Sequence, residues 1–383
     1  MPPDRAPGGD DRAIVRALVR WLARDARPFP WRADVPPGNR DPYVVLVSEI
    51  MLQQTQASRV AERLPRFLEQ FPTLTALARA DEDTVLAQWS GLGYYRRARL
   101  LHAAAKAAVA LHGGVLPADV QALGDLPGIG PYTAGAIASL AFGQPAPLVD
   151  GNVARVLMRL SARPGRTNAP ADVRWAWERA SELVTASPKQ APALNEALME
   201  LGATICTPPP RAPACDQCPI REHCRARARG EQLSIPAPGK PPTVGKVYAG
   251  TLVLIAGERL VVEQRQATGL WAALWQAPTI ERPDRAPTLA EVCEAFGVAP
   301  SVASPLTAFT HRTTHRAVHF QAWLARVGPR HAAARTRRTI TAAELPSLGL
   351  STPQKRLFDA ARINPASGSQ KPRARSSRSA RAS

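Results

Sequence analysis

Two carboxyl groups in this 383-residue chain stand in sequence settings that favour opposite charge states. Glu49 is the only acid in a largely apolar run, residues 43–55, and Asp150 comes directly before apolar residues that recur with helical spacing. An apolar environment favours a protonated Glu, whereas we expect an Asp at a helix N-terminus to stay ionised. Such a pair can split a glycosidic bond, because one carboxyl protonates the leaving group while the other supports the sugar cation. The structural alternatives are a salt bridge for Glu49 and a simple helix cap for Asp150.

A glycine-containing turn lies upstream of Asp150. Residues 126–134 read LPGIGPYTA, and Gly128 and Gly130 stand between two helical patterns. Successive N–H groups in such a turn form a concave anion site, so the turn could hold a nucleic-acid backbone without reading its sequence. The alternative is an ordinary connection between two helices.

Four of the five cysteines are crowded into nineteen positions, with the spacing C-x8-C-x2-C-x5-C. Four thiolates from one short loop can hold a tetrahedral zinc ion or a [4Fe–4S] cluster. Structural zinc sites usually have two C-x2-C pairs and only one is present, so the pattern favours the cluster without excluding zinc. The candidate ligands are Cys206, Cys215, Cys218 and Cys224.

The charge of the chain points to a polyanionic partner. Lys and Arg number 49 against 31 Asp and Glu, which gives a net charge of +18 and a pI near 10.8. Six of the basic residues lie in 362–383, where there is no acid, and we expect that segment to be a disordered basic tail. No apolar run reaches the roughly 18 residues of a membrane helix. We therefore expect a cytoplasmic protein with no membrane partner.

The elements that must position these groups change in kind along the chain. Up to residue 230 the pattern is helical, and Asp41-Pro42 is expected to begin the helix that carries Glu49. Residues 231–246 are rich in proline and predict a linker. We expect a helical domain over 1–230.

A smaller α+β domain is expected over 247–361. Residues 247–255 and 259–265 have the pattern of strands, and 288–296 that of a helix. Cys293, in that helical pattern, is expected to be a buried thiol.

Residues 48–56 (SEIMLQQTQ), the turn with Asp150 and the four-cysteine loop together resemble the MutY-type adenine DNA glycosylases, of the endonuclease III-like helix-hairpin-helix superfamily. The resemblance implies that Glu49 is the general acid and that the four cysteines hold a [4Fe–4S] cluster, although the first gap has eight residues where the family commonly has six. Relatives that also cut the strand have a Lys where Tyr132 stands, and a phenol cannot form their Schiff base. Tyr132 and Asn152 would then position Asp150 and the sugar by hydrogen bonds.

The resemblance also covers segments that could open a duplex. Residues 91–97 (GLGYYRR) put aromatic rings beside guanidinium groups, so rings could wedge into the base stack while Arg side chains hold phosphates. Residues 53–55 could fill the gap left by a flipped base, and Arg32 lies in a family segment near the adenine pocket. A capped helix end with solvated Arg is the alternative for 91–97. The expected DNA contacts of this half are Arg32, Gln53, Gln54, Thr55, Leu92, Tyr94, Gly128 and Gly130.

The C-terminal half resembles the second domain of the same family, which is similar in fold to Nudix pyrophosphatases. The resemblance lies in residues 269–278, but the Glu-rich helix that Nudix hydrolases need for Mg²⁺ is missing after them, so recognition is expected and hydrolysis is not. Phe309, Thr310 and His311 resemble a Phe-Ser/Thr-His loop that senses oxidised guanine in the opposite strand. His315 and His319 follow at intervals of four, a spacing that puts all three histidines on one face of a single strand, and metal binding is not expected.

The expected fold is a mainly α helix-hairpin-helix glycosylase core with an iron–sulfur loop, followed by a smaller α+β Nudix-like domain. The expected function is removal of adenine mispaired with 8-oxoguanine or guanine in double-stranded DNA, by a monomer associated with the bacterial nucleoid, which leaves an abasic site. Two alternatives remain: an endonuclease III-like or G:T mismatch thymine glycosylase, and a non-catalytic iron–sulfur DNA-binding protein.

Overall fold

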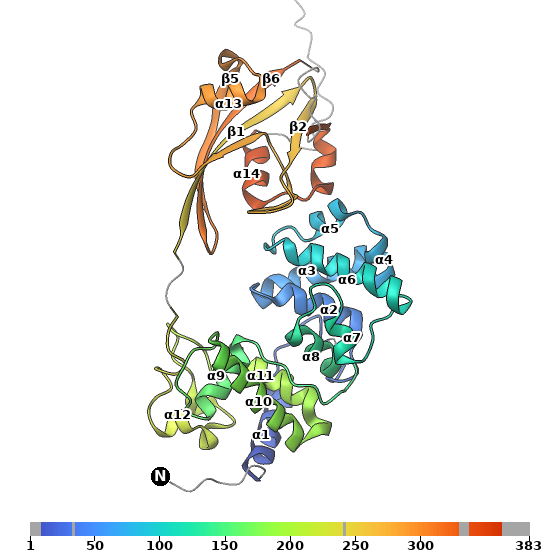
Figure 1. Ribbon diagram of the computed structural model, residues 1–383, viewed down its shortest axis with the longest axis vertical. Helices are drawn as coiled ribbons and strands as arrows, with labels where there is room; N and C mark the ends of the chain where they lie inside the picture. Colours follow the sequence, from blue (N-terminus) through green and yellow to red (C-terminus); the bar gives the residue numbers. More distant parts are fainter. Residues whose placement is uncertain (1–8, 33–34, 240–242, 329–336, 362–383) are drawn as a thin grey trace, which may run out of the picture. The chain divides into compact units, whose positions relative to one another are not determined.

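The computed structural model describes residues 9–32, 35–239, 243–328 and 337–361. The chain divides into two compact units, Met1–Pro241 and Pro242–Ser383 (Figure 1). The expected basic tail, 362–383, lies outside the described residues. No described helix has the length and apolar character needed to cross a membrane.

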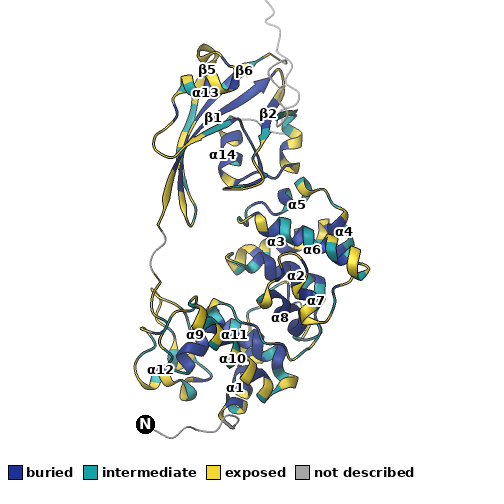
Figure 2. Cartoon of the chain, viewed as in Figure 1, coloured by how far each residue is buried: buried dark blue, intermediate teal, exposed yellow. Residues whose placement is uncertain are grey.

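The first unit is helical in its described part. Helix α2 contacts α3, α6 and α8, and both α2 and α8 are buried along most of their length, as Figure 2 shows. Helices that are apolar on nearly every side belong inside a bundle, so the Glu49 helix is a core element. The α-helices of this unit are α1 (Gly9–Asp25), α2 (Pro42–Leu52), α3 (Ala57–Gln70), α4 (Leu74–Arg79), α5 (Glu82–Gln88), α6 (Arg96–His112), α7 (Val120–Gly124), α8 (Pro131–Leu140), α9 (Gly151–Leu160), α10 (Pro170–Ala186), α11 (Ala191–Thr204) and α12 (Arg225–Ala228).

Helix α2 begins where it was predicted and ends earlier. Asp41 Oδ1 accepts a hydrogen bond from the Tyr43 backbone N–H at 2.7 Å, and Pro42 stands in the first turn, which confirms the expected start. The apolar pattern predicted helix as far as residue 55, but α2 stops at Leu52 and Gln54 has a φ of 56°. That prediction was wrong because a distant guanidinium, Arg97, takes the last carbonyl groups of the helix.

The expected helix–turn–helix is confirmed, with α7 before the turn and α8 after it. Gly128 has a φ of 77°, and a Cβ there would lie 2.6 Å from Leu100 Cβ, so both the conformation and the space require glycine. Helix α11 also packs closely against the N-terminus of α9, directly after Asp150. A Cβ on Gly202 of α11 would lie 2.7 Å from Asn152 Cβ.

The second unit is built on a seven-stranded mixed sheet with the order β3-β2-β1-β6-β5, in which β4 pairs with β1 and β7 with β2. Strands β1 and β6 run parallel, and β5 and β6 form an antiparallel pair. The predicted strands and helix are confirmed as β1, β2 and α13, the helix capped by Thr288. The elements are β1 (Gly245–Ala256), β2 (Arg259–Gln264), β3 (Trp275–Gln276), β4 (Thr279–Arg282), α13 (Leu289–Phe296), β5 (Ala303–Arg312), β6 (Arg316–Val327), β7 (Arg337–Ile340) and α14 (Thr352–Ala360).

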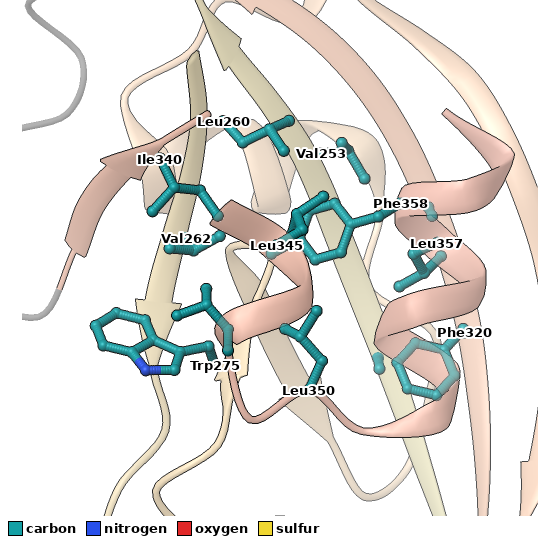
Figure 3. Close-up of a cluster of buried hydrophobic side chains, with 14 of the residues drawn as sticks. Val253, Leu260, Val262, Trp275, Phe320, Ile340, Leu345, Leu350, Leu357 and Phe358 are labelled. Atoms are coloured by element: carbon teal, nitrogen blue, oxygen red, sulfur yellow. The ribbon is translucent and has the colours of Figure 1, made fainter. Parts of the chain in front are cut away.

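Each face of this sheet is covered by a different helix. Val253 and alternate residues of β1 pack with Leu357 and Phe358 of α14, in the cluster drawn in Figure 3. The residues between them, such as Leu252, pack on the other face with Cys293 of α13. The expectation that Cys293 is buried is therefore confirmed.

The three histidines do not share one strand, and that expectation was wrong. His311 lies on β5 and His319 on β6, while His315 lies in the turn between the two strands. His311 pairs with Val318 and His319 with Thr310, so the two strand histidines point to opposite faces of the sheet. In the described part of the chain, no group of three or more His, Cys, Asp or Glu residues is placed to hold a metal ion.

Candidate active site

A cavity of about 1100 Å³ in the first unit collects most of the residues that the sequence singled out. Its lining comes from α2 and the turn after it, from the starts of α3, α8 and α9, from α11, and from residues 27–32 and Arg40. The expected residues that line it are Arg32, Glu49, Gln53, Gln54, Thr55, Tyr132, Asp150 and Asn152. Leu92, Tyr94, Gly128 and Gly130 are not among its lining residues.

Glu49 is buried, with 4% of its surface exposed, and it accepts a hydrogen bond at Oε2 from the Tyr132 hydroxyl at 2.7 Å. Burial raises the pKa of Glu49 to about 7, the Tyr132 hydrogen bond lowers it, and the charge of Asp150 raises it further. The carboxyl group can therefore hold a proton near neutral pH. Burial and the neighbouring carboxylates raise the pKa of Tyr132 well above its ordinary value. The phenol therefore stays protonated and donates a hydrogen bond to Glu49. The sequence led us to expect Tyr132 to bond to Asp150, and its observed partner is Glu49.

Asp150 is held at the start of α9 by two hydrogen bonds. Its Oδ1 accepts from the Val153 backbone N–H at 2.7 Å, and its Oδ2 accepts from Asn152 Nδ2 at 2.9 Å. Asn152 Oδ1 in turn accepts from Arg155 Nη2 at 2.9 Å, and the same Nη2 donates to the Gly202 carbonyl at 2.7 Å. The carboxylate therefore faces the cavity in an orientation that α9 and α11 set together.

One wall of the cavity is an ion-pair network that the sequence did not suggest. Arg32 donates from Nε to Glu196 at 2.7 Å and from Nη2 to Glu200 at 2.9 Å. Arg40 binds Glu196 at 2.8 Å, and Arg27 binds Glu200 at 2.5 Å. Although burial acts in the opposite direction, the guanidinium groups of Arg27 and Arg32 hold the pKa of Glu200 below its ordinary value. Two Glu four residues apart in an otherwise apolar helix were the signal that could have revealed this wall.

The residues expected to open a duplex divide into exposed and buried ones. Tyr94 is 44% exposed and has a φ of 46°, and Gln54 is exposed on the turn after α2. Leu92 is only 5% exposed and Arg97 only 9%, so neither side chain presents itself to a bound strand. Of the two arginines in 91–97, whose side chains were expected to hold phosphates, only Arg96 is exposed, and Leu92 lies in the core.

All four cysteines line a second cavity, between the end of α11 and α12. The long first gap is accommodated as a loop, closed where the Ala214 N–H donates to the Ile205 carbonyl at 2.9 Å. Arg159, which is 2% exposed, donates from Nη1 to Cys206 Sγ at 3.3 Å, while its buried Nη2 has no hydrogen-bond partner. Burial, followed by the charges of the other thiols, raises the pKa of Cys218.

In the second unit, the expected recognition residues lie on strand β5 and not in a loop. Phe309 is stacked on Phe320, with ring centroids 5.1 Å apart. Thr310 Oγ1 lies 2.9 Å from His319 Nδ1, and His311 packs against Trp271 at 5.7 Å between ring centroids. Of the three, Thr310 is exposed and the other two are half-buried.

Both units match known families. Residues 47–179 match the model of the HhH-GPD superfamily base excision DNA repair protein, and residues 250–360 match the NUDIX domain model. The adenine DNA glycosylase of Mycolicibacterium smegmatis is 40% identical over 276 residues, which cover 70% of this chain and 87% of that protein. The chain belongs to the adenine DNA glycosylase family.

Two mammalian relatives are longer than this chain. The human protein is 37% identical over 70% of this chain, and the rat protein 36% identical over 71%. The matched regions make up 57% and 61% of those two proteins, so the chain spans about three fifths of their length. Among solved structures, a thermostable thymine-DNA glycosylase aligns with a TM-score of 0.50 and 30% identity, over 57% of this chain and 97% of its own.

The matched regions place the candidate residues of this adenine DNA glycosylase family member in two groups. Glu49, Tyr132 and Asp150 lie within the base excision repair match, and Phe309–His311 lies within the NUDIX match. The cysteine loop, 206–224, lies outside both. Its assignment therefore depends on its own geometry and on the family.

Proposed function

We propose that this chain removes adenine from mispairs with 8-oxoguanine or guanine in double-stranded DNA and leaves an abasic site. The observation that carries the proposal is the pairing in one cavity of a buried Glu49, bonded to Tyr132 at 2.7 Å, with an Asp150 side chain that caps α9. Membership of the adenine DNA glycosylase family supports the choice of leaving group. The net charge of +18 suits a DNA partner, and we expect a monomer at the bacterial nucleoid.

In this mechanism the adenine enters the cavity as a flipped base. Glu49 gives its proton to a ring nitrogen of the adenine while the bond from that base to the sugar breaks, and the bonding electrons leave with the adenine. The negative charge of Asp150 stabilises the positive charge that develops on the sugar. Water then adds to the sugar carbon and loses a proton, which leaves an abasic site and free adenine. Tyr132 keeps the Glu49 carboxyl oriented throughout, and Asn152 does the same for Asp150.

The cavity favours base removal without strand cleavage. Among the described residues that line it there is no Lys, so no amine is present to attack the sugar as a Schiff-base nucleophile. This separates the proposal from an endonuclease III-like activity. A thymine glycosylase remains the second candidate, because a thymine-DNA glycosylase shares the fold of the first unit. A duplex with a G:T mispair distinguishes the two.

We further propose that Cys206, Cys215, Cys218 and Cys224 hold a [4Fe–4S] cluster. The four thiols line a common cavity, and the single C-x2-C pair together with membership of the family favours a cluster over zinc. The unpartnered Nη2 of Arg159 adds a buried positive group that suits an anionic cluster. When bound, such a cluster would cross-link the segment 206–224 at its four cysteines.

The second unit, within 247–361, is proposed to read the base opposite the adenine. Thr310 is exposed on β5 with its hydroxyl held by His319, and such a hydroxyl can recognise one oxidised base edge. Thr310→Ala with His311→Ala should lower the preference for 8-oxoguanine over guanine by about ten- to a hundredfold. Deletion of 246–383 should leave a core that still cuts adenine but discriminates poorly.

Single-turnover cleavage of a duplex with one A:8-oxoguanine pair tests the proposed activity. The wild type should release adenine and leave an abasic site that alkali cleaves. Glu49→Gln and Asp150→Asn should each lose excision while they keep duplex binding, because phosphate contacts supply most of the affinity. Excision by both variants at the wild-type rate, or excision of thymine from G:T and no adenine, would overturn the proposal.

A further inference from the structure

Arg97 caps the end of the helix that carries Glu49. It lies in the first turn of α6 and is 9% exposed. Its Nη1 donates to the carbonyl oxygens of Ile50 at 2.8 Å and Met51 at 2.9 Å, and also to that of Gln53. These carbonyls belong to the last turn of α2 and the residue after it, so one guanidinium nitrogen satisfies groups that a helix end leaves free.

The other guanidinium nitrogen holds the glycine-containing turn before α6. Arg97 Nη2 donates to the carbonyl oxygens of Leu92 and Gly93, both at 3.2 Å, and to Thr55 Oγ1 at 2.9 Å. The guanidinium carbon also lies 5.4 Å from the ring centroid of Trp89 and 5.5 Å from that of Tyr94. A single side chain therefore joins two segments about 40 residues apart.

Both segments have a residue with a strained backbone beside an Arg97 contact. Gln54, between Gln53 and Thr55, has a φ of 56°, and Tyr94, directly after Gly93, has a φ of 46°. Residues other than glycine rarely adopt these left-handed conformations, and they persist only where the surrounding contacts impose them. Gln54 lines the Glu49 cavity, and Tyr94 is 44% exposed.

We propose that Arg97 is a positioning residue. It holds the backbone at Gln54 and Tyr94 so that both side chains can enter a duplex at a fixed position relative to Glu49. This inference rests on the proposed function. The guanidinium acts through the backbone it binds and touches neither the base nor a phosphate, because its two terminal nitrogens already donate to five carbonyls and a hydroxyl. The exposed Arg96 beside it is the residue available to the DNA backbone.

The test compares a stacked substrate with one that is already open. One duplex has a paired adenine opposite 8-oxoguanine, and the other has the same adenine in a bubble of unpaired nucleotides. Arg97→Lys keeps the charge but cannot reach both sets of acceptors. It should slow single-turnover excision from the stacked duplex by about ten- to a hundredfold, and excision from the bubble by no more than about threefold, because no unstacking remains to be driven there.

Arg96→Met is the matched control. Removal of this exposed charge should weaken binding of both substrates alike, so at subsaturating protein it should slow excision from both by the same factor. Equal losses by Arg97→Lys on both substrates, or no loss on the stacked one, would overturn the inference.

A second measurement keeps the inference testable if excision by Arg97→Lys is too slow to follow. In a Glu49→Gln background, a 2-aminopurine beside the target adenine should brighten on binding, and the added Arg97→Lys should reduce this gain severalfold while circular dichroism stays unchanged. An undiminished gain would refute the positioning role. Failure of the wild type to excise adenine from either substrate would refute the proposed function, independently of these fluorescence results.

Discussion

Replacement of Glu49 by Gln should raise the stability of the protein at alkaline pH and abolish excision of adenine. Burial raises the pKa of Glu49 from its ordinary 4.5 to about 7. The stability that comes with the bound proton is fully present below pH 4.5 and is lost as the pH rises through about 7, because the folded protein must then hold a buried charge. The difference between the two pKa values corresponds to about 3 kcal/mol.

The Gln side chain has nearly the same shape and stays neutral at every pH. Glu49→Gln should therefore resemble the wild type near pH 5 and exceed it at pH 8 by about 2–3 kcal/mol. For a unit of this size, that gain corresponds to a Tm about 5–10 °C higher. Excision should fall at least about a hundredfold at every pH, because an amide has no proton to give to the adenine.

The assay is a set of melting curves from pH 5 to pH 8 at constant salt, beside single-turnover rates on the A:8-oxoguanine duplex. The wild-type rate should fall about tenfold for each pH unit well above 7. Glu69→Gln, at an exposed position on α3, is the control and should change neither Tm nor rate. If the Tm difference between Glu49→Gln and the wild type is the same at pH 5 and pH 8, the carboxyl is not protonated at neutral pH and the reasoning fails.

Three other substitutions have outcomes that the observed contacts determine. Tyr132→Phe removes the hydrogen bond that lowers the pKa of Glu49, so the pH above which excision slows should move upward from about 7, and an unmoved pH–rate profile would contradict the contact. Cys218→Ser should lose the broad visible absorption and most of the iron, whereas Cys293→Ala, buried in the second unit, should keep both; stoichiometric zinc in a colourless wild type would count against the cluster. Thr310→Ala alone should lower the preference for 8-oxoguanine over guanine about tenfold, measured as the ratio of the two dissociation constants, and an unchanged ratio would remove Thr310 from recognition.

The parts of the site that local sequence determines were predictable. Asp150 stands directly before a helical pattern, and a side chain in that position caps the helix through its own neighbours. Glu49 lies on a helix whose other residues are almost all apolar, so burial and a raised pKa followed from the composition of that helix alone. Residues 247–255 likewise indicated a strand from their own β-branched and aromatic content, and β1 confirms it.

Contacts between distant segments were not predictable in this way. Whether Tyr132 donates to Asp150 or to Glu49 depends on how α8 packs on α2, and no pattern within either helix specifies that packing. The wall formed by Arg32 and Glu196 joins residues 164 positions apart. The only sign of such ion pairs in a single sequence is the presence of acidic residues in an otherwise apolar helix.

The same limit explains why net charge overstates the DNA-contacting surface. Arg97, Arg32 and Arg159 all counted toward the expected attraction for a polyanion, and all three are buried or nearly so, with their guanidinium groups bonded to carbonyls, carboxylates or a thiol. Such groups release no counterions when DNA binds, so they add nothing to the salt dependence of binding. Exposed residues such as Arg96 do contribute: Arg96→Met should reduce the slope of log affinity against log salt by about one, and Arg97→Lys should leave it unchanged. An equal reduction by both would mean that Arg97 leaves its carbonyl partners to meet a phosphate, and its assignment as a clamp between the two turns would then be wrong.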